Sequence, residues 1–329
     1  MPRPMSHAIR IHELGGPEVL RWESADPRAP GPGEVRLRHT AVGVNYIDVY
    51  FRTGLYPGPE LPFTPGMEGT GMVEAVGPEV GELAVGDRVA YAGGALGAYS
   101  EQRNMPAERL VPLPDGVDDR TAAAMMLKGM TAQYLLHRTH PVGPGDTILL
   151  HAAAGGVGLI ACQWAKHLGA RVIGTVGSKE KAEIARAYRC DHPIVYTEED
   201  LVARVRELTA GQGVPVVYDS VGEATFMRSL DCLATRGHMV SFGQSSGAVA
   251  PLDIAELSKR GSLSLTRPTL AHYTASRGDL LTTARALFDV VAAGHVRIEI
   301  GRSYALAEAA AAHRALESRA TRGSTVLLP

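Results

Sequence analysis

A small-residue turn at residues 153–158 carries the clearest chemical pattern in the sequence. It reads AAGGVG where a dinucleotide-binding chain has G-x-G-x-x-G, so Ala153 stands at the first glycine position. In such a turn Gly155 lets the backbone approach a pyrophosphate, and Gly158 lets the following helix pack tightly on the preceding strand. The unpaired N–H groups at the start of that helix face the phosphates. The pattern predicts a dinucleotide site, with a simple helix–sheet packing turn as the alternative, and its predicted members are Ala154, Gly155, Gly156, Val157 and Gly158.

The residues after the next predicted strand indicate which dinucleotide binds. An NAD site places an Asp or Glu about 20 residues beyond the turn, where it binds the ribose 2′-hydroxyl. The segment RVIGTVGSKEKAE offers hydroxyl and ammonium groups there instead, and we expect Glu180 to point along the following helix. Such donors suit a 2′-phosphate, so NADPH is the predicted cofactor, with Gly177, Ser178 and Lys181 in its site. The alternative is that these lysines only form a solvated first turn of a helix.

The elements around the turn alternate between predicted strands and helices. Strand-like segments at 147–152, 171–176, 193–196, 215–221 and 238–243 are separated by segments with helical spacing of apolar residues, at 156–169, 178–189, 198–211 and 223–237. This alternation predicts an α/β domain with a parallel, doubly wound sheet.

The rest of the chain has a different pattern. Residues 7–120 contain short alternating segments separated by Gly and Pro, which predicts antiparallel, partly barrel-like β structure, followed by a helix over 120–139. After about residue 262 the strand–helix alternation stops, and we expect the tail to return to the first domain. A length of 329 residues also favours two domains over one.

Composition and charge narrow the possible partners. The chain has 33 basic and 35 acidic residues and a net charge of −2, which gives no electrostatic footprint for nucleic acid or an anionic membrane. No apolar run reaches about 18 residues, and the N-terminus lacks the apolar core of a signal peptide. The three cysteines are far apart, which argues against a disulfide framework. We expect a cytoplasmic protein that binds neither nucleic acid nor membrane.

Motifs along the whole chain resemble one known family. NYIDVYFRTGLYP, GMEGTGMVEAVG, LKGMTAQYLL, AAAGGVGLIACQWAK, VVYDSVG and SLDCLATRGHMVSFG are similar to segments of the zeta-crystallin-like NADPH:quinone oxidoreductases, a zinc-free group of the medium-chain dehydrogenase/reductase superfamily. The resemblance implies a GroES-like β-rich catalytic domain at residues 1–126, completed by 267–329. It also implies a Rossmann NADPH-binding domain at 127–266, a homodimer, and quinone reduction in a cleft between the domains.

The resemblance also implies roles for individual residues. Asn45 and Thr131 correspond to positions beside the nicotinamide, Asp48 belongs to the same motif as Asn45, and Tyr50 and Tyr56 correspond to aromatic residues of the substrate pocket. As candidate catalytic residues it gives Asn45, Tyr50, Tyr56 and Thr131. As further cofactor-binding residues it gives Asp48, Ser220 and Tyr196, the strand end Phe242, Gly243 and Gln244, and Arg319 from the tail. Each of these also has a structural interpretation, such as an ordinary half-buried aromatic or a charge at a helix end.

No metal site is expected. Zinc dehydrogenases of the superfamily carry ligands at the positions of Asn45, Met67 and Leu127, and these three side chains cannot build a tetrahedral zinc site. Alcohol oxidation needs a Lewis acid or a base to remove the hydroxyl proton, whereas a quinone is already electron-poor. The predicted work of the protein is therefore to position the cofactor and the acceptor in an apolar site.

Three functions remain open at this point. The first is NADPH-dependent quinone reduction. The second is NADPH-dependent reduction of an activated C=C bond in an enone, alkenal or enoyl thioester, which needs a positioned acid to protonate carbon. The third is a non-enzymatic NADPH-binding role, structural or RNA-associated, against which the net charge counts.

Overall fold

The computed structural model describes residues 5–318 and 321–329, and this part of the chain forms two compact units. The first unit contains the N-terminal segment up to Met130, Thr274–Ala292, and the chain from Ile298 onward. The second unit contains Thr131–Tyr273 and Ala293–Arg297. Each unit is described by itself below.

The two units meet at Met130 and Tyr273, a few residues beyond the domain boundaries predicted at 126 and 266, which stay a prediction. The first limit lies inside a continuous helix, α2 (Asp119–Tyr134), where no break in composition marks it. At the second limit, the ring of Tyr273 stacks on Tyr134 with centroids 4.5 Å apart. Residues 293–297 join the second unit because Gln163 exchanges hydrogen bonds with the backbone of Arg297.

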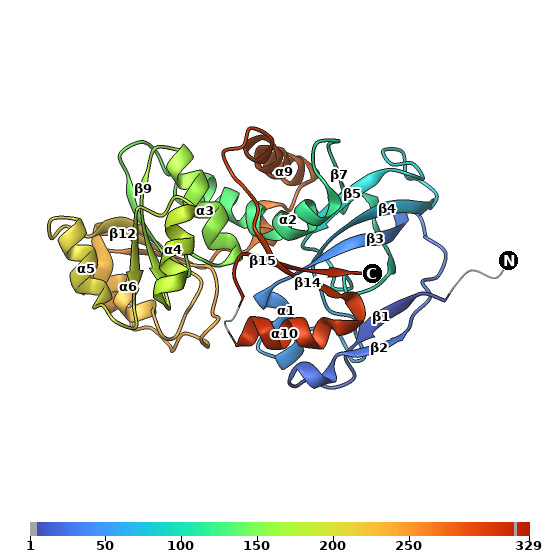
Figure 1. The fold of residues 1–329 in the computed structure, drawn as a ribbon, viewed down its shortest axis with the longest axis horizontal. Helices are drawn as coiled ribbons and strands as arrows, with labels where there is room; N and C mark the ends of the chain where they lie inside the picture. Colours follow the sequence, from blue (N-terminus) through green and yellow to red (C-terminus); the bar gives the residue numbers. More distant parts are fainter. Residues whose placement is uncertain (1–4, 319–320) are drawn as a thin grey trace. The chain divides into compact units, whose positions relative to one another are not determined.

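A largely antiparallel sheet forms the first unit. In the described residues its strand order is β14-β15-β3-β4-β5-β7, with β6 also paired to β3. The C-terminal strand β15 pairs antiparallel with β3, placing Val326 opposite Gly43, so the red C-terminal segments in Figure 1 lie among the blue N-terminal ones. Leu37, Val89 and Leu327 are fully buried in the core of this unit. Its elements are β1 (His7–Arg10), η1 (Pro17–Val19), β2 (Arg21–Ser24), β3 (Glu34–Val44), α1 (Tyr46–Thr53), β4 (Glu68–Val76), β5 (Arg88–Ala92), β6 (Gln102–Pro106), η2 (Ala107–Arg109), β7 (Val111–Pro112), most of α2, α9 (Arg277–Ala292), β14 (Ile300–Ala305), η4 (Leu306–Glu308), α10 (Ala309–Glu317) and β15 (Ser324–Leu328).

A parallel sheet forms the second unit, which confirms the predicted doubly wound α/β architecture. Within the described residues its order is β10-β9-β8-β11-β12-β13, and every neighbouring pair is parallel. The strand order reverses between β8 and β11, and ligands of such sheets bind at the carboxyl ends of the strands beside this reversal. Its elements are the π-helical turn η3 (Leu135–Thr139), β8 (Thr147–Leu150), α3 (Gly156–His167), β9 (Arg171–Val176), α4 (Lys179–Ala187), β10 (His192–Val195), α5 (Leu201–Leu208), β11 (Val214–Asp219), α6 (Phe226–Cys232), β12 (Leu233–Ser241), α7 (Ala255–Lys259), β13 (Ser264–Thr266) and α8 (Leu270–Tyr273).

One predicted helix was too long. The sequence pattern extended a helix over 223–237, whereas α6 ends at Cys232 and β12 begins at the next residue. Arg236 has φ +62°, a left-handed conformation that no helix interior accommodates, so the apolar spacing in this stretch was misleading.

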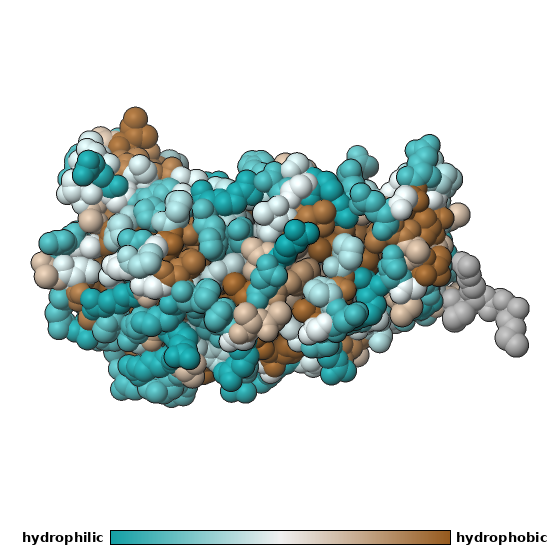
Figure 2. Space-filling view, turned by 90° about the horizontal axis from the view of Figure 1, so that it is seen from above, coloured by the Kyte–Doolittle hydropathy of each residue, from teal (hydrophilic) through white to brown (hydrophobic). Residues whose placement is uncertain are grey.

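The surface gives no sign of a membrane span. Every helix in the described ranges is too short or too polar to cross a bilayer. On the face seen in Figure 2, brown apolar residues lie in several separate places among teal hydrophilic ones.

Candidate active site and nucleotide-binding turn

The turn between β8 and α3 has the close backbone packing that its sequence predicts. The N–H of Gly155 donates to the carbonyl of Ala152 over 2.8 Å, and α3 then begins at Gly156 without a side-chain cap. A Cβ on Gly158 would lie 2.3 Å from the carbonyl oxygen of Ala152, so only glycine fits there. The first N–H groups of α3 therefore lack a capping side chain, which suits an anionic ligand.

The structure explains why alanine serves at the first glycine position. The left-handed residue of the turn is Ala152 with φ +54°, one position before Ala153. Space for the Ala153 methyl group comes from Gly174 on β9, because a Cβ on Gly174 would lie 2.6 Å from it. The backbone N–H of Ala153 also donates to the carbonyl of Thr175 over 3.0 Å, which ties the turn to β9.

The residues predicted to contact a 2′-phosphate partly gather at the end of β9. The Tyr196 hydroxyl lies 3.0 Å from the place of a Cβ on Gly177, so these two residues are neighbours. Ser178 is the N-cap of α4, and its Oγ accepts from the backbone N–H of Lys181 over 3.3 Å. Arg319, predicted to join them, lies outside the described residues.

A carboxylate lies closer to this group than expected. The pKa of Glu180 is lowered, first of all by a hydrogen bond from the Ser178 side chain. Glu180 therefore turns back toward the N-cap of α4, because the first turn of a helix favours an acidic side chain. The neighbouring Lys179 is exposed and pairs with Glu198 at 3.1 Å.

The loop after β11 and the loop after β12 pack against each other. A Cβ on Gly243, after β12, would lie 2.6 Å from the carbonyl oxygen of Ser220, after β11. The N–H of Phe242 donates to the carbonyl of Asp219 over 2.8 Å, and the N–H of Ser245 donates to that of Ser220 over 3.2 Å. The predicted residues Ser220, Phe242, Gly243 and Gln244 are all partly exposed at this edge.

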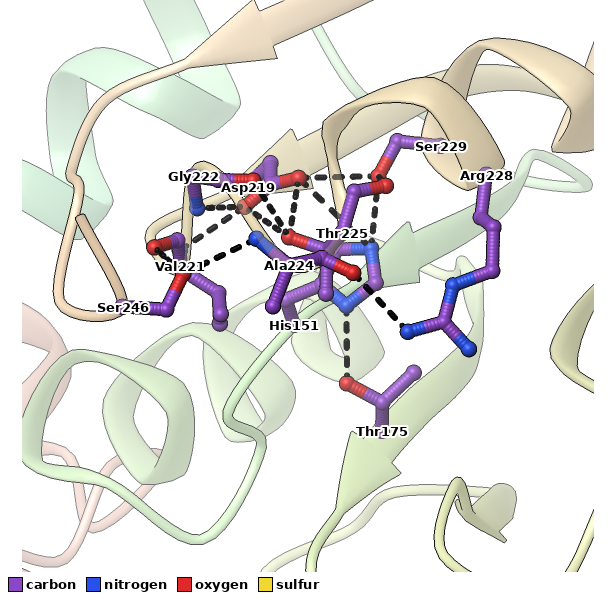
Figure 3. A network of polar contacts seen from close by, with 10 residues as sticks. All are labelled: His151, Thr175, Asp219, Val221, Gly222, Ala224, Thr225, Arg228, Ser229 and Ser246. Atoms are coloured by element: carbon purple, nitrogen blue, oxygen red, sulfur yellow. Dashed lines mark hydrogen bonds and ion pairs between the residues drawn. The ribbon is translucent and has the colours of Figure 1, made fainter. Parts of the chain in front are cut away.

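Beneath these loops lies a buried polar network that sequence reasoning missed (Figure 3). Asp219 Oδ1 accepts from the backbone N–H groups of Val221 and Gly222, at 2.7 and 3.0 Å. Its Oδ2 accepts from the hydroxyls of Thr225 and Ser229, each at 2.8 Å. We call Asp219, Thr225, Ser229, His151 and Thr175 the Asp219 cluster. The one signal in the sequence is an aspartate at the end of a predicted apolar strand.

The hydrogen bonds of the Asp219 cluster determine the state of His151. Ser229 donates its proton to Asp219, so its oxygen accepts from His151 Nε2–H over 2.9 Å. The other ring nitrogen accepts from the Thr175 hydroxyl, also at 2.9 Å. Burial lowers the pKa of His151, which keeps the ring neutral. His151, Thr175 and Asp219 follow or end β8, β9 and β11, so the cluster joins three strand ends that carry the predicted nucleotide site.

A second buried polar cluster lies in the first unit and contains Asn45 and Asp48. Asn45 follows β3 and is the N-cap residue of α1. Its backbone N–H donates to Asp48 Oδ2 over 2.8 Å, and its Nδ2 donates to Glu68 Oε2, also over 2.8 Å. The structure therefore brings the predicted residues Asn45 and Asp48 together, and adds Glu68 from the start of β4.

Asp48 is a buried acid with an unused oxygen. Oδ2 accepts two hydrogen bonds, whereas Oδ1 has no partner in the part of the chain that the structure describes. Burial raises the pKa of Asp48 to about 7, against the lowering effects of Asn45, Tyr99 and Lys128. The carboxyl thus holds a proton up to about pH 7.

A chain of fixed hydrogen bonds approaches Asp48 from α10. The Tyr99 hydroxyl donates to Asp48 Oδ2 over 3.0 Å, and His313 Nε2 lies 2.9 Å from that hydroxyl. Arg52 Nη1 donates to His313 Nδ1 over 3.1 Å, so the His313 proton is on Nε2. Burial, together with the Arg52 charge, lowers the pKa of His313 to about 3 and keeps it neutral. Arg52 is in turn paired with Glu317 at 2.6 Å.

Glu68, which accepts from Asn45, also forms an ion pair with Lys128. Lys128 Nζ lies 3.1 Å from Glu68 Oε2, and the backbone N–H of Leu127 donates to Oε1 over 2.7 Å. A Cβ on Gly43 would lie 2.3 Å from Oε2, so glycine is required beside this carboxylate. We call Asn45, Asp48, Glu68, Lys128 and Tyr99 the Glu68 cluster. Sequence reasoning noted Glu68 only as part of a motif and missed Lys128, because 60 residues separate the two.

The remaining predicted catalytic residues lie on α1, after it, and on α2. Tyr50 and Tyr56 pack against each other with ring centroids 5.0 Å apart, in a group that includes Tyr46 and Phe51. Thr131 is nearly buried and follows Lys128 by three residues on α2.

The side chains at the expected metal-ligand positions do not fit zinc. Asn45 directs its Nδ2 to Glu68, and Leu127 contributes only a backbone N–H. Among the described residues, no three of His, Cys, Asp and Glu are placed to hold a metal ion.

Parts of both units match known protein families. The family model for the alcohol dehydrogenase GroES-like domain matches residues 31–115, and that for zinc-binding dehydrogenase matches residues 156–279. The quinone oxidoreductase of Pseudomonas aeruginosa is 55% identical over 325 residues, covering 99% of this chain and 100% of the relative.

Two other similar proteins are a 2-haloacrylate reductase and a second quinone oxidoreductase. The 2-haloacrylate reductase of a Burkholderia species is 49% identical over 332 residues, with 99% of each chain covered. The crystal structure of Escherichia coli quinone oxidoreductase complexed with NADPH superposes with a TM-score of 0.96 at 48% identity, covering 98% of this chain and 100% of that one.

Proposed function

Because this chain belongs to the quinone oxidoreductase family, we propose that it is an NADPH-dependent enzyme that reduces quinones. The observation that carries the proposal is the match over the full length of both chains to a quinone oxidoreductase at 55% identity. The E. coli relative whose structure superposes at 0.96 is complexed with NADPH, which supports the same cofactor here. The predicted family, the fold class and the enzyme class agree with these comparisons.

The cofactor fits the turn in the second unit. We propose that the N–H groups at the start of α3, with residues 154–158, bind the pyrophosphate, since a Cβ at Gly158 would collide with the backbone. Gly177, Ser178, Lys181, Tyr196 and Arg319 would hold the adenosine phosphate. Ser220 and residues 242–244 would face the nicotinamide. When bound, NADPH supplies the hydride, and the chain supplies orientation and polar groups.

We further propose that residues 1–126 and 267–329 form the catalytic domain and that 127–266 form the NADPH-binding domain. Asn45, Asp48, Tyr50, Tyr56 and Thr131 remain our candidates for contact with cofactor or substrate. The chemistry is proposed to be zinc-independent, because Asn45, Met67 and Leu127 offer no set of metal donors.

A second candidate function is reduction of activated C=C bonds. The 49% identity to a 2-haloacrylate reductase favours it. Protonating carbon needs a positioned acid, and the buried, protonated Asp48 or the hydroxyls of Tyr50 and Tyr56 are the candidates. A non-enzymatic role has no comparable support.

A panel of acceptors separates the two reductase functions. NADPH oxidation is measured with 1,2- and 1,4-quinones, 2-haloacrylate and alkenals, in wild type and in Tyr50→Phe and Tyr56→Phe. We expect turnover with quinones and little effect of either substitution on it. A kcat loss confined to the alkene substrates, with those as the better substrates, would establish the second function instead.

We also propose that the protein is a cytoplasmic homodimer. The support is the family resemblance described above. Light scattering on the purified chain tests the dimer, and a monomeric mass would contradict it.

A further inference from the structure

Lys128 is a buried cation whose hydrogen bonds are incomplete. Its side chain is 7% exposed and that of Glu68 is fully buried. An ammonium has three N–H donors, and the described residues supply one acceptor, Glu68 Oε2 at 3.1 Å. Water has little access at this exposure, and leaving buried charged donors unpaired is costly. The two remaining donors therefore point to a ligand oxygen that completes the site.

Glu68 holds Lys128 in place without saturating it. The same Oε2 also accepts from Asn45 Nδ2 at 2.8 Å, and Oε1 is engaged by the N–H of Leu127. Gly43 leaves the space in which this carboxylate lies. The nearby acid Asp48 feels the charge of Lys128 and is itself protonated up to about pH 7. Below about pH 7 the cluster thus contains the Lys128–Glu68 ion pair and the neutral carboxyl of Asp48.

A purely structural ion pair would look different. Lys166 in the second unit contacts Asp191 at 2.6 Å with a side chain that is 44% exposed, so water serves its other donors. Lys128, in contrast, is 7% exposed and has one acceptor among the described residues, Glu68 Oε2. Asn45, Leu127 and Lys128 all donate to the same carboxylate, that of Glu68.

We propose that Lys128 binds the carbonyl oxygen of the substrate and donates the proton that completes its reduction. This inference rests on the proposed function and names the catalytic group that it lacks. Glu68 and Asn45 are positioning residues, because Glu68 accepts one hydrogen bond from the ammonium and Asn45 donates to Glu68, and two N–H bonds of Lys128 remain for the ligand.

The chemistry balances as follows for a quinone. Hydroquinone formation requires one hydride and one proton: NADPH, when bound, would supply the hydride with both electrons, its C–H bond breaking as a bond to one quinone oxygen forms, and the proton goes to the other oxygen. The negative charge that develops on the carbonyl oxygen is stabilised by the Lys128 ammonium. The Lys128 N–H bond breaks, the O–H bond of the hydroquinone forms at that oxygen, and a proton from bulk solvent restores the ammonium once the product has left. No further oxidant, reductant or metal is needed.

The proposed binding of a substrate oxygen by Lys128 can be tested without turnover, with a phenol that changes colour on ionisation. 4-Nitrophenol mimics the reduced product, and its phenolate absorbs visible light while its neutral form does not. The full-length chain is titrated with it at one pH, alone and with NADP⁺, in wild type, Lys128→Met, Glu68→Gln and the double variant Glu68→Gln/Lys128→Met. Lys166→Met is the matched control, and NADPH turnover with a quinone is assayed in parallel.

We expect wild type to bind the phenolate form and Lys128→Met to weaken that binding by about ten- to a hundredfold, the worth of a charge-assisted hydrogen bond. Glu68→Gln should retain or strengthen it, because the cation then lacks its counter-charge, and Lys166→Met should match wild type. If Lys128→Met does not fold, the double variant is compared with Glu68→Gln instead, because removing both charges leaves neither one buried without its partner. The double variant should then bind the phenolate more weakly than Glu68→Gln. Phenolate bound equally by wild type and the lysine variants, or not bound by wild type, overturns the proposal. Phenolate binding through Lys128 without quinone turnover would refute the proposed function alone.

Discussion

The two buried polar clusters differ in how completely their hydrogen bonds are made. In the Asp219 cluster both carboxylate oxygens accept, each ring nitrogen of His151 has a partner, and the hydroxyls complete the set. In the Glu68 cluster Asp48 Oδ1 has no partner among the described residues and Lys128 uses one donor of three. Both clusters are buried and each unit contains one of them.

The difference separates a scaffold from a reactive site. Buried polar groups in proteins are nearly always satisfied, and exceptions call for a ligand or a chemical role. The Asp219 cluster fixes the ends of three strands, and we infer that it positions the loops that bind the nucleotide. The Glu68 cluster keeps unused donors and a protonated acid, and we infer that it completes its bonds with substrate.

Removing Asp219 should cause the largest effect. Asp219→Ala leaves two hydroxyls and two backbone N–H groups buried without an acceptor, and we expect a loss of about 4 kcal/mol in the free energy of unfolding. Urea denaturation measures it. Asp289→Ala, at an exposed position on α9, is the matched control and should cost less than about 0.5 kcal/mol. Equal losses in the two variants would mean that the cluster is not the scaffold.

The pH dependence of stability should reveal Asp48. Its pKa rises from 3.8 in the unfolded chain to about 7 in the folded protein, so the folded state binds the proton more tightly. Stability from this group is complete below the unfolded pKa and is lost as pH rises to the folded pKa, about 4 kcal/mol in all. The Asp48→Asn variant should not lose this stability as pH rises, because an amide does not titrate.

The measurement is the difference between wild type and Asp48→Asn in the free energy of unfolding at two pH values. Other titrating groups cancel in that difference. We expect wild type to lose about 2–3 kcal/mol relative to Asp48→Asn between pH 5 and pH 8. A difference that does not vary with pH would show that Asp48 is ionised in the folded protein.

Lys181 should affect ligand affinity and leave stability unchanged, unlike Asp219. Lys181→Ala would remove the proposed charge-assisted hydrogen bond to the 2′-phosphate, and we expect KM for NADPH to rise about ten- to a hundredfold while KM for NADH stays constant. Lys179→Ala, which breaks the exposed pair with Glu198, is the control and should change neither constant. Equal effects on both cofactors would contradict the proposed phosphate contact.

The sequence predicted features whose signals are local. The turn at 153–158 and the parallel sheet follow from spacing within about ten residues, and the structure contains both. The structure also shows why alanine is tolerated at position 153: Gly174 leaves space for its methyl group. No local sequence pattern encodes this contact between two small residues. The boundary inside α2 had no signal, because one continuous helix crosses it.

The clusters depend on contacts between distant residues and were not predictable in this way. His151 and Ser229 are 78 residues apart in the sequence, and Glu68 and Lys128 are 60 apart. An isolated Lys, Glu or His has the same sequence signal whether it is exposed or buried. Asn45 and Asp48 were found only through the family resemblance, which gave no role to Lys128, Tyr99 or Asp219.

Quinone-dependent oxidation of NADPH by the metal-stripped protein tests the central claim most directly. The purified chain is dialysed against a strong chelator, its zinc content is checked by elemental analysis, and kcat/KM is measured for NADPH and NADH with a 1,4-quinone. Our account predicts that NADPH is oxidised at the same rate before and after chelation and that it is preferred over NADH by at least about tenfold. Loss of activity together with stoichiometric zinc, or no quinone-dependent oxidation of NADPH, would contradict it.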